Sequence, residues 1–192
     1  MMTHRFAPRL FFAALVAVGL AACQTTQTGS TGSPSPQPQT ISVTPNVNAL
    51  FTVSIAPSVP TPVVLGQEMR FRVQSSETGF ANVYMLGASG QSLVVAENMP
   101  LQAGRVREVP DPVTGFSLTA TPPVGTDRVI LLVTRSPMAG IVTGSGAAMN
   151  TPQGVTLSHA DLVARINAKT AAIPDSNWAT AEGAVTVVGG RV

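Results

Sequence analysis

Apolar and polar residues alternate in short runs from residue 49 onward, and Gly, Pro, Asn and Asp separate the runs. The clearest run is 69–74, where Met69, Phe71 and Val73 alternate with Arg70 and Arg72. Because successive side chains of a strand point to opposite faces, this run predicts a strand with one buried face. The same reasoning predicts further strands at 51–56, 80–86, 91–95, 105–109, 116–120, 129–133 and 184–188.

Two features indicate how these strands are arranged. Residues 129–133 are all apolar, which is typical of a central strand covered on both faces. Residues 80–86 and 91–95 flank the run Gly87-Ala88-Ser89-Gly90, whose length suits a hairpin loop and whose glycines allow positive φ. The pattern therefore predicts a sheet of antiparallel hairpins around a buried strand.

A single helix is predicted near the C-terminus. Ser158 can cap its N-terminus, Asp161 favours the positive end of the helix dipole, and apolar residues then recur at helical spacing to about residue 172. Trp178 and the strand 184–188 are then expected to return to the sheet. Together the pattern predicts a mainly β domain, an antiparallel β-sandwich of the immunoglobulin-like kind with one short C-terminal helix.

The N-terminus has the order of a secretory signal. Arg5 and Arg9 precede an apolar stretch over 10–20, and small residues follow, so residues 1–22 are predicted to be a signal peptide. The stretch that ends at Cys23 is shorter than the roughly 20 residues that a transmembrane helix needs. A signal that is removed is therefore favoured over a membrane-spanning anchor.

The run Leu20-Ala21-Ala22-Cys23 resembles the bacterial lipobox. This resemblance implies cleavage between Ala22 and Cys23 and acylation of Cys23, with palmitate among the usual acyl groups. Two or three acyl chains would hold the protein firmly on a membrane, whereas one chain binds only marginally. The alternative is a buried free thiol, but Cys23 borders a segment that cannot build a core.

The segment after Cys23 predicts a tether. Residues 24–46 are rich in Thr, Gln, Ser, Gly and Pro and carry no charge, which is typical of a disordered spacer. The predicted organisation is a signal peptide at 1–22, a lipidated cysteine and tether at 23–48, and one β-sandwich domain at 49–192. Gln24 stands where lipoproteins retained in the inner membrane commonly have aspartate, so the outer membrane is the expected location.

Charge and composition argue against several functions. The net charge of +2 comes from Arg5 and Arg9, because the remaining nine Lys and Arg balance nine Asp and Glu. The part after the signal therefore has no basic footprint for nucleic acid. With Cys23 acylated no thiol remains, so neither a disulfide nor a cysteine metal site is expected.

No catalytic constellation is evident. Ser158, His159 and Asp161 have the residue types of a hydrolytic triad, but neighbours on one helical turn point in different directions and cannot align. The glycine-rich segment 139–154 lacks the lysine of a phosphate-binding loop. His159 is the only histidine after the signal, which argues against a histidine metal cluster. We therefore expect no enzyme activity, no cofactor and no metal.

A succession of residues over 65–137 is similar to a bacterial family of domains of unknown function, family forty-three eighty-four. The residues that carry the resemblance are Leu65-Gly66, Phe80, Tyr84, Gly90, Asn98, Ala103-Gly104, Val109-Pro110, Phe116 and Pro122-Pro123-Val124-Gly125. Relatives usually carry a leucine, an aromatic residue and a proline before the asparagine, where this chain has Val94-Val95-Ala96-Glu97. The resemblance implies a β-sandwich-like module of the cell envelope with assembly or interaction roles, and it transfers no catalytic residue.

The resulting hypothesis is a non-enzymatic envelope lipoprotein whose β domain binds an envelope protein, as an accessory of a secretion or surface assembly. Tyr84 and Trp178 are the candidate interaction residues, because amphipathic aromatics are enriched at binding hot spots. Burial in the core is the alternative for both. The alternative function is a periplasmic module for a small ligand or a metal.

The methionines suggest one such metal. Thioethers suit monovalent copper, but the alternative role of methionine is to fill gaps in a core. The methionines concerned are Met69, Met85, Met99, Met138 and Met149.

Overall fold

The computed structural model describes residues 41–190. The chain divides into two units, 1–39 and 40–192, and the described residues belong to the second. The predicted signal peptide, the cleavage site at Ala22 and Cys23, and the tether up to residue 40 lie outside the described residues.

The described residues form a mainly β fold with one α-helix and sheets of six, three and two strands. In the six-stranded sheet the strands lie in the order β10 (Gln153–Val155), β6 (Ser92–Leu101), β5 (Gly79–Leu86), β9 (Gly125–Thr134), β11 (Trp178–Val188) and β2 (Val63–Val64). The three-stranded sheet has the order β1 (Val53–Pro57), β4 (Phe71–Ser75) and β7 (Arg107–Val109). A two-stranded sheet pairs β3 (Glu68–Met69) with β8 (Leu118–Thr119).

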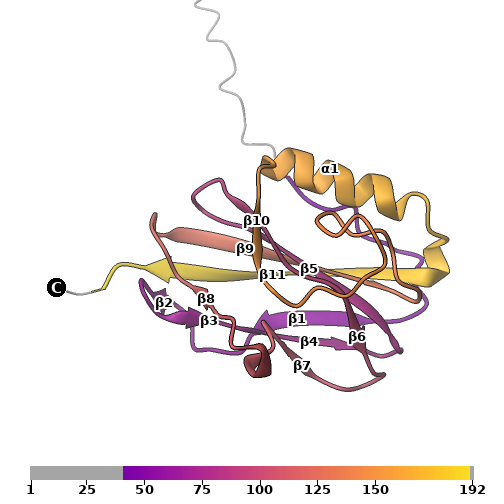
Figure 1. Cartoon of the computed structure of the whole chain (residues 1–192), viewed down its shortest axis with the longest axis horizontal. Helices are drawn as coiled ribbons and strands as arrows, with labels where there is room; N and C mark the ends of the chain where they lie inside the picture. The colour runs from indigo at the N-terminus through magenta and orange to yellow at the C-terminus, as the bar shows by residue number, and fades with distance from the viewer. Residues whose placement is uncertain (1–40, 191–192) are drawn as a thin grey trace, which may run out of the picture. The chain divides into compact units, whose positions relative to one another are not determined.

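These elements lie in three layers (Figure 1), with α1 (His159–Thr170) on one face of the six-stranded sheet and the three-stranded sheet on the other. Two 3-10 turns, η1 (Pro112–Thr114) and η2 (Asp175–Asn177), lie in the connections. The strand pairs are antiparallel except β2 and β11, which run parallel. The large sheet is therefore mixed, whereas the sequence predicted a purely antiparallel arrangement.

Strand β9 separates two hydrophobic cores. It lies between β5 and β11, and its residues 129–133 are completely buried, which confirms the predicted central strand. Val129, Leu131 and Val133 face the inter-sheet core, defined here as the cluster between the six- and three-stranded sheets. Ile130 and Leu132 face the helix-side core, the cluster that includes Leu162 and Ile166 of α1.

The helix begins where its cap predicts. The backbone N–H of Asp161 donates to Ser158 Oγ at 3.1 Å, which satisfies one of the unpaired donors at the helix N-terminus. Leu162, Val163 and Ile166 are buried against the sheet. No helix between residues 41 and 190 is both long enough and apolar enough to cross a membrane.

The predicted strand over 69–74 is divided in two. Met69, Phe71 and Val73 share a buried face, as the alternation predicts. However, Met69 pairs with Leu118 in the small sheet, whereas Phe71 pairs with Pro57 and Val109 in the three-stranded sheet. Local alternation fixes which side chains are buried, but it cannot show that the chain changes sheets between two of them.

Strand β11 begins at Trp178, six residues before the predicted start at 184. Residues 178–187 pair continuously with β9, although the run Ala179-Thr180-Ala181-Glu182-Gly183 has few large apolar side chains. A Cβ at residue 183 would lie 3.2 Å from the carbonyl oxygen of Ile55 on β1. The small residues permit this close approach of β1, and they also weaken the strand pattern.

Residues 41–48, predicted to belong to the tether, lie against the domain. Val43 is 3% exposed, and the N–H of Thr44 donates to Asn167 Oδ1 of α1 at 3.0 Å. Asn46 Nδ2 donates to the carbonyl oxygens of Asp175 and Trp178, both at 2.7 Å. The domain therefore begins before residue 49, and these contacts to residues more than 100 positions away leave no periodic pattern in the sequence.

We expect Phe71→Ala to destabilise the domain strongly, because Phe71 is completely buried in the inter-sheet core. The loss should be about 3–5 kcal/mol, the usual range for removing a buried phenylalanine ring. The free energy of unfolding in urea measures it. Phe116→Ala is the matched control, because Phe116 is 47% exposed and should lose about 1 kcal/mol or less. Equal losses for the two variants would show that this core is wrongly placed.

Candidate functional site

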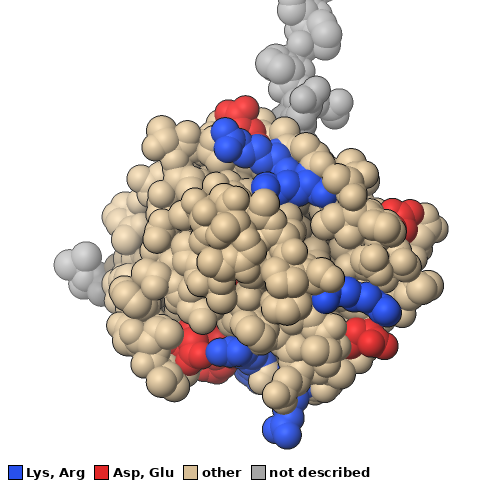
Figure 2. Space-filling model, turned by 45° about the vertical axis from the view of Figure 1, so that its right-hand side comes forward, with Lys and Arg blue, Asp and Glu red and all other residues tan. Residues whose placement is uncertain are grey.

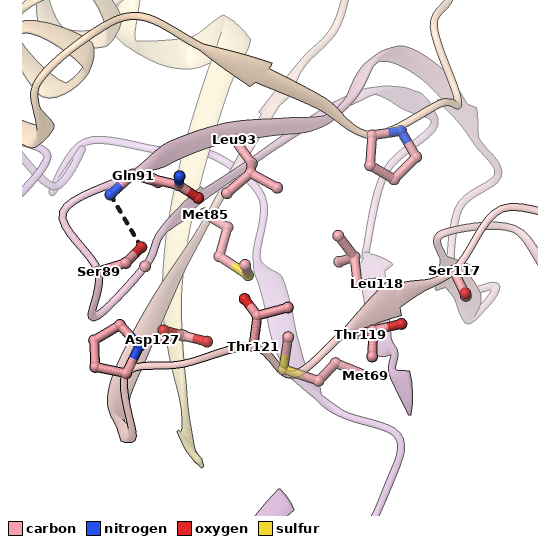
Figure 3. A pocket seen from close by; sticks show the side chains of 13 residues that line it. Met69, Met85, Ser89, Gln91, Leu93, Ser117, Leu118, Thr119, Thr121 and Asp127 are labelled. Atoms are coloured by element: carbon pink, nitrogen blue, oxygen red, sulfur yellow. Dashed lines mark hydrogen bonds between the residues drawn. The ribbon is translucent and has the colours of Figure 1, made fainter. Parts of the chain in front are cut away.

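A pocket of about 330 Å³ opens at one end of the inter-sheet core and is called the end pocket here (Figure 3). The β5–β6 hairpin forms one wall, and the segment that contains β8 forms the opposite wall. Its apolar lining consists of Met69, Met85, Leu93, Leu118, Pro123 and Pro152. Its polar lining consists of Ser89, Gln91, Ser117, Thr119, Thr121 and Asp127, with Gly87 completing it. This volume is at the lower end of the range for small-molecule sites.

The apolar lining follows from strand alternation. Met85 lies on the face of β5 that also carries Ala81 and Val83, so its side chain belongs to the inter-sheet core. Met69 and Leu118 are a cross-strand pair of the small sheet and belong to the same cluster. The end pocket is thus the place where the inter-sheet core reaches the surface.

Asp127 brings a carboxylate into this apolar setting. It lies two residues before Val129 on β9, so the alternation directs it to the same face as the inter-sheet core. Asp127 is only 8% exposed, and its Oδ1 accepts a hydrogen bond from the N–H of Ala88 at 2.7 Å. Figure 3 shows its side chain directed into the pocket toward Thr121.

The hairpin wall is held by backbone geometry. Gly90 has a φ of 83°, as the predicted loop requires, and the N–H of Gly87 donates to the carbonyl oxygen of Gln91 at 2.9 Å. A Cβ at residue 125 would lie 2.8 Å from the Cβ of Ala88, so glycine at the start of β9 permits the loop to approach. His159 Nε2 lies 3.1 Å from the carbonyl oxygen of Gln91 and links this hairpin to α1.

Exposed apolar side chains adjoin the pocket in sequence. Phe116 is 47% exposed and precedes the lining residue Ser117, and Val124 is 53% exposed and follows Pro123. Val113, on the preceding turn η1, is 91% exposed. The N–H of Val113 and the guanidinium of Arg107 lower the pKa of Asp111, whose side chain caps that turn.

A second polar cluster lies inside the domain, at Glu97 and Asn98. Two residues of β6, 97 and 98, lie opposite the single residue Asn82 of β5, which is a β-bulge. Asn98 adopts a positive φ of 50° in this bulge. Its Nδ2 donates to the carbonyl oxygen of Met138 at 2.8 Å, and the N–H of Met138 donates back to Asn98 Oδ1 at 2.9 Å.

Glu97 is completely buried, and its carboxylate holds the glycine-rich segment. It accepts hydrogen bonds from the backbone N–H groups of Ile141, Val142 and Thr143, the last two at 3.0 Å. A Cβ at residue 140 would overlap the Glu97 carboxylate, so glycine is required there. The segment therefore does form an anion-binding cradle, but the anion is a side chain of the protein itself.

The structure buries both candidate interaction residues. Tyr84 is completely buried and Trp178 is 5% exposed, and both belong to the helix-side core. Burial, together with the negative charge of Glu97, raises the pKa of the Tyr84 hydroxyl well above its usual value. Neither side chain presents a surface to a partner, so their placement fits the core alternative and not the predicted interaction role.

Ser158, His159 and Asp161 are placed as a helix cap. Ser158 Oγ donates to Asp161 Oδ2 at 2.7 Å, whereas His159 turns to the carbonyl oxygen of Gln91. Within residues 41–190, no three His, Cys, Asp or Glu side chains are grouped so as to hold a metal ion. The five methionines are buried, and of these only Met69 and Met85 line the end pocket.

Charged side chains are few and mixed in sign. Figure 2 shows separate basic and acidic groups on a surface that is mostly uncharged. Within the described residues the ion pairs join Arg70 to Glu68 and Glu108, Arg107 to Asp111, and Arg128 to Glu182. On the face in view, no large patch of one charge is available to attract a polyanion.

The two buried carboxylates, Asp127 and Glu97, do not stand out in the sequence as site residues. Both occur among scattered acidic residues, although each leaves a signal. Asp127 has the same strand parity as Val129, and Glu97 interrupts the apolar run Val94-Val95-Ala96 in a strand. A charged residue within a run that is otherwise buried needs a partner in the fold or a ligand.

Residues 63–137 match the model of a family described as Domain of unknown function (DUF4384). The match confirms the resemblance expected for 65–137, and it contains every residue that lines the end pocket except Pro152. Strand β11 lies outside the matched region, yet it pairs with β9 and β2 inside it. No curated protein and no solved structure matches the chain.

We expect Glu97→Gln to destabilise the protein and to loosen residues 139–147. The amide keeps the size of the side chain but loses the charge that three backbone N–H groups face. The loss should be about 2–4 kcal/mol, because hydrogen bonds to charged groups are the stronger class and a buried cluster is left only partly satisfied. Urea unfolding measures the loss, and hydrogen exchange at Ile141, Val142 and Thr143 measures the loosening.

Glu77→Gln is the control for Glu97→Gln, because Glu77 is exposed and the net charge changes equally. It should leave both the stability and the exchange rates unchanged. If both variants behave like the wild type, Glu97 does not hold the segment.

Proposed function

We propose that this protein is a non-enzymatic lipoprotein of the bacterial cell envelope whose β domain binds an envelope protein. In this proposal Cys23 carries the acyl chains and places the domain on the outer membrane. The partner would belong to a secretion or surface assembly for which this protein is an accessory. The proposed relation of the two larger sheets is an immunoglobulin-like sandwich.

The observation that carries the binding role is the apolar rim of the end pocket. Phe116 and Val124 are about half exposed and stand next to pocket-lining residues in the sequence. Most large apolar side chains of the described residues are buried, so exposed ones at positions that adjoin pocket-lining residues favour a binding surface. The segment also lies within the matched family region.

The anchoring role is supported by the sequence alone. Leu20-Ala21-Ala22-Cys23 stands between an apolar stretch preceded by arginines and a polar segment, which is the position that a lipobox requires. Acylation at this position would keep a binding domain at the membrane surface. A partner in the same membrane would then be met at a high effective concentration.

The second candidate function is a periplasmic module that binds a small ligand or a metal. The end pocket favours this function, because it combines apolar walls with a nearly buried carboxylate. The same pocket can accept a free ligand or a side chain of a partner. The two candidates therefore differ in what enters the pocket and not in where binding occurs.

Cys23→Ala should abolish membrane anchoring. The variant lacks the thiol that would receive the acyl chains, so it should become soluble in the periplasm or remain an uncleaved precursor. Metabolic labelling with a palmitate analogue and membrane fractionation measure this. Wild-type protein should carry the label and fractionate with the outer membrane. A Cys23→Ala variant that fractionates as the wild type does would refute the anchoring proposal.

Phe116→Asp should abolish capture of the partner. A charge in the middle of an apolar contact is left without water or a counter-charge, which opposes association. In-cell crosslinking of tagged protein, followed by mass spectrometry, measures the capture. Val47→Asp is the matched control, because Val47 is 87% exposed in the N-terminal segment. If Phe116→Asp, with unchanged melting, still captures the same partner, the rim is not the binding surface.

A further inference from the structure

We infer that the end pocket binds a cationic group on an aliphatic stem, an ammonium or a guanidinium, with Asp127 as its counter-charge. This inference rests on the second candidate function, ligand binding in the end pocket, and names the chemistry of the ligand. It is carried by the charge balance of Asp127 and by the composition of the walls around it.

Asp127 has no counter-charge within residues 41–190. Asp127 is only 8% exposed, and none of the ion pairs of the described residues includes it. Its one hydrogen bond is the contact between Oδ1 and the N–H of Ala88. A carboxylate that is mostly buried keeps only part of its hydration, and a cation in the pocket would compensate for the part that is lost.

The hydrogen bond from the N–H of Ala88 accounts for the role of one oxygen of Asp127, but not for the charge or the second oxygen. An asparagine at residue 127 would present the same Oδ1 to the same N–H and would tie the hairpin to β9 equally well. The negative charge and the second oxygen are left without a role in the hairpin. Their position on the wall of a pocket gives them one.

The walls specify the rest of the ligand. Met69, Met85 and Leu93 offer apolar walls that suit the methylene stem of an amine or a guanidine. Figure 3 shows Thr121 and Asp127 directed toward the same space, where their oxygens can accept hydrogen bonds from a cationic head. An anion would meet the carboxylate, and a neutral apolar ligand would leave it unpaired. The pocket therefore favours a cation over both.

Two sources can supply this chemistry. A lysine or arginine of a partner protein would enter from the apolar rim at Phe116 and Val124, and a free amine would enter alone. Both present a charged head on a methylene stem, so both are covered by the same inference. One probe for each source can tell them apart.

Methionine methyl NMR of the full chain, purified in mild detergent, tests the inference. The probes are pentylamine, pentanol and pentanoate, which share a stem and differ in charge. Pentylamine should shift the methyls of Met69 and Met85 saturably and leave those of Met99, Met138 and Met149 unchanged, because only the first two line the pocket. Pentanol and pentanoate should bind at least about tenfold more weakly.

Asp127→Asn is the decisive variant, because it keeps the acceptor for Ala88 and removes the charge. Pentylamine should bind it at least about tenfold more weakly than the wild type. Glu77→Gln changes the net charge equally at an exposed site and should bind as the wild type does. Unchanged Met138 and Met149 methyl signals would show that Asp127→Asn is folded. As a second measurement, added salt should weaken pentylamine binding in the wild type and in Glu77→Gln, but not in Asp127→Asn.

Equal binding of pentylamine and pentanol, or undiminished binding to Asp127→Asn, would overturn the inference. If silver ion, a thioether ligand, shifts Met69 and Met85 while the amines do not, the inference fails and the metal-binding function stands. If no probe shifts these methyls, the inference and the ligand-binding function fail together.

Nα-acetyl-lysine methylamide and cadaverine distinguish the sources, and binding of either one supports the inference. Binding of the lysine derivative indicates a protein side chain as the natural occupant. Binding of cadaverine alone indicates a free amine.

Discussion

Burial of β9 on both faces is the constraint that organises the domain. Its residues 129–133 are completely buried, three of them in the inter-sheet core and two in the helix-side core. Because β9 also pairs with β5 and β11 along its length, both layers that cover it are fixed to the same strand. Removing either layer would expose two or three of these five side chains, so neither core can form alone.

The same strand places the charge of the end pocket. Strand geometry gives Asp127 the face of Val129, so the carboxylate must point between the sheets at the end of the core. A solvated position would require a one-residue change of register, which would expose the apolar residues of β9 instead. The buried charge is therefore a consequence of β9, and a cationic ligand is the component that would balance it.

Glu97 shows a different solution for a buried carboxylate, because three backbone N–H groups of the glycine-rich segment satisfy it. Asp127 receives one N–H and no cation from the described residues, which is why the binding proposal concerns the end pocket.

Much of the fold could be predicted from the sequence because its signals are local. Three signals depend only on residues close together in the sequence: the alternation at Met69, Phe71 and Val73, the apolar run of β9, and the Ser158 cap. The bulge at Glu97, the docking of residues 41–48 and the early start of β11 depend on distant parts of the chain, and no periodicity records such contacts.

The candidate site is harder to predict than the fold. Aromatic character favours Tyr84 and Trp178, but the helix-side core contains both side chains. Asp127 follows a proline- and glycine-rich segment and therefore resembles a turn residue. Only the position where β9 begins shows that Asp127 belongs to the strand and faces the core.

The stability of Asp127→Asn decides whether the charge of Asp127 serves a ligand or the fold. If the charge serves a ligand, removing it should leave the free energy of unfolding in urea unchanged or raise it. The reason is that the variant no longer buries a charge without a counter-charge. The full chain without added ligand should be compared with the wild type under the same conditions. A loss of more than about 2 kcal/mol would contradict the ligand role, because it would show that the charge itself holds the hairpin to β9.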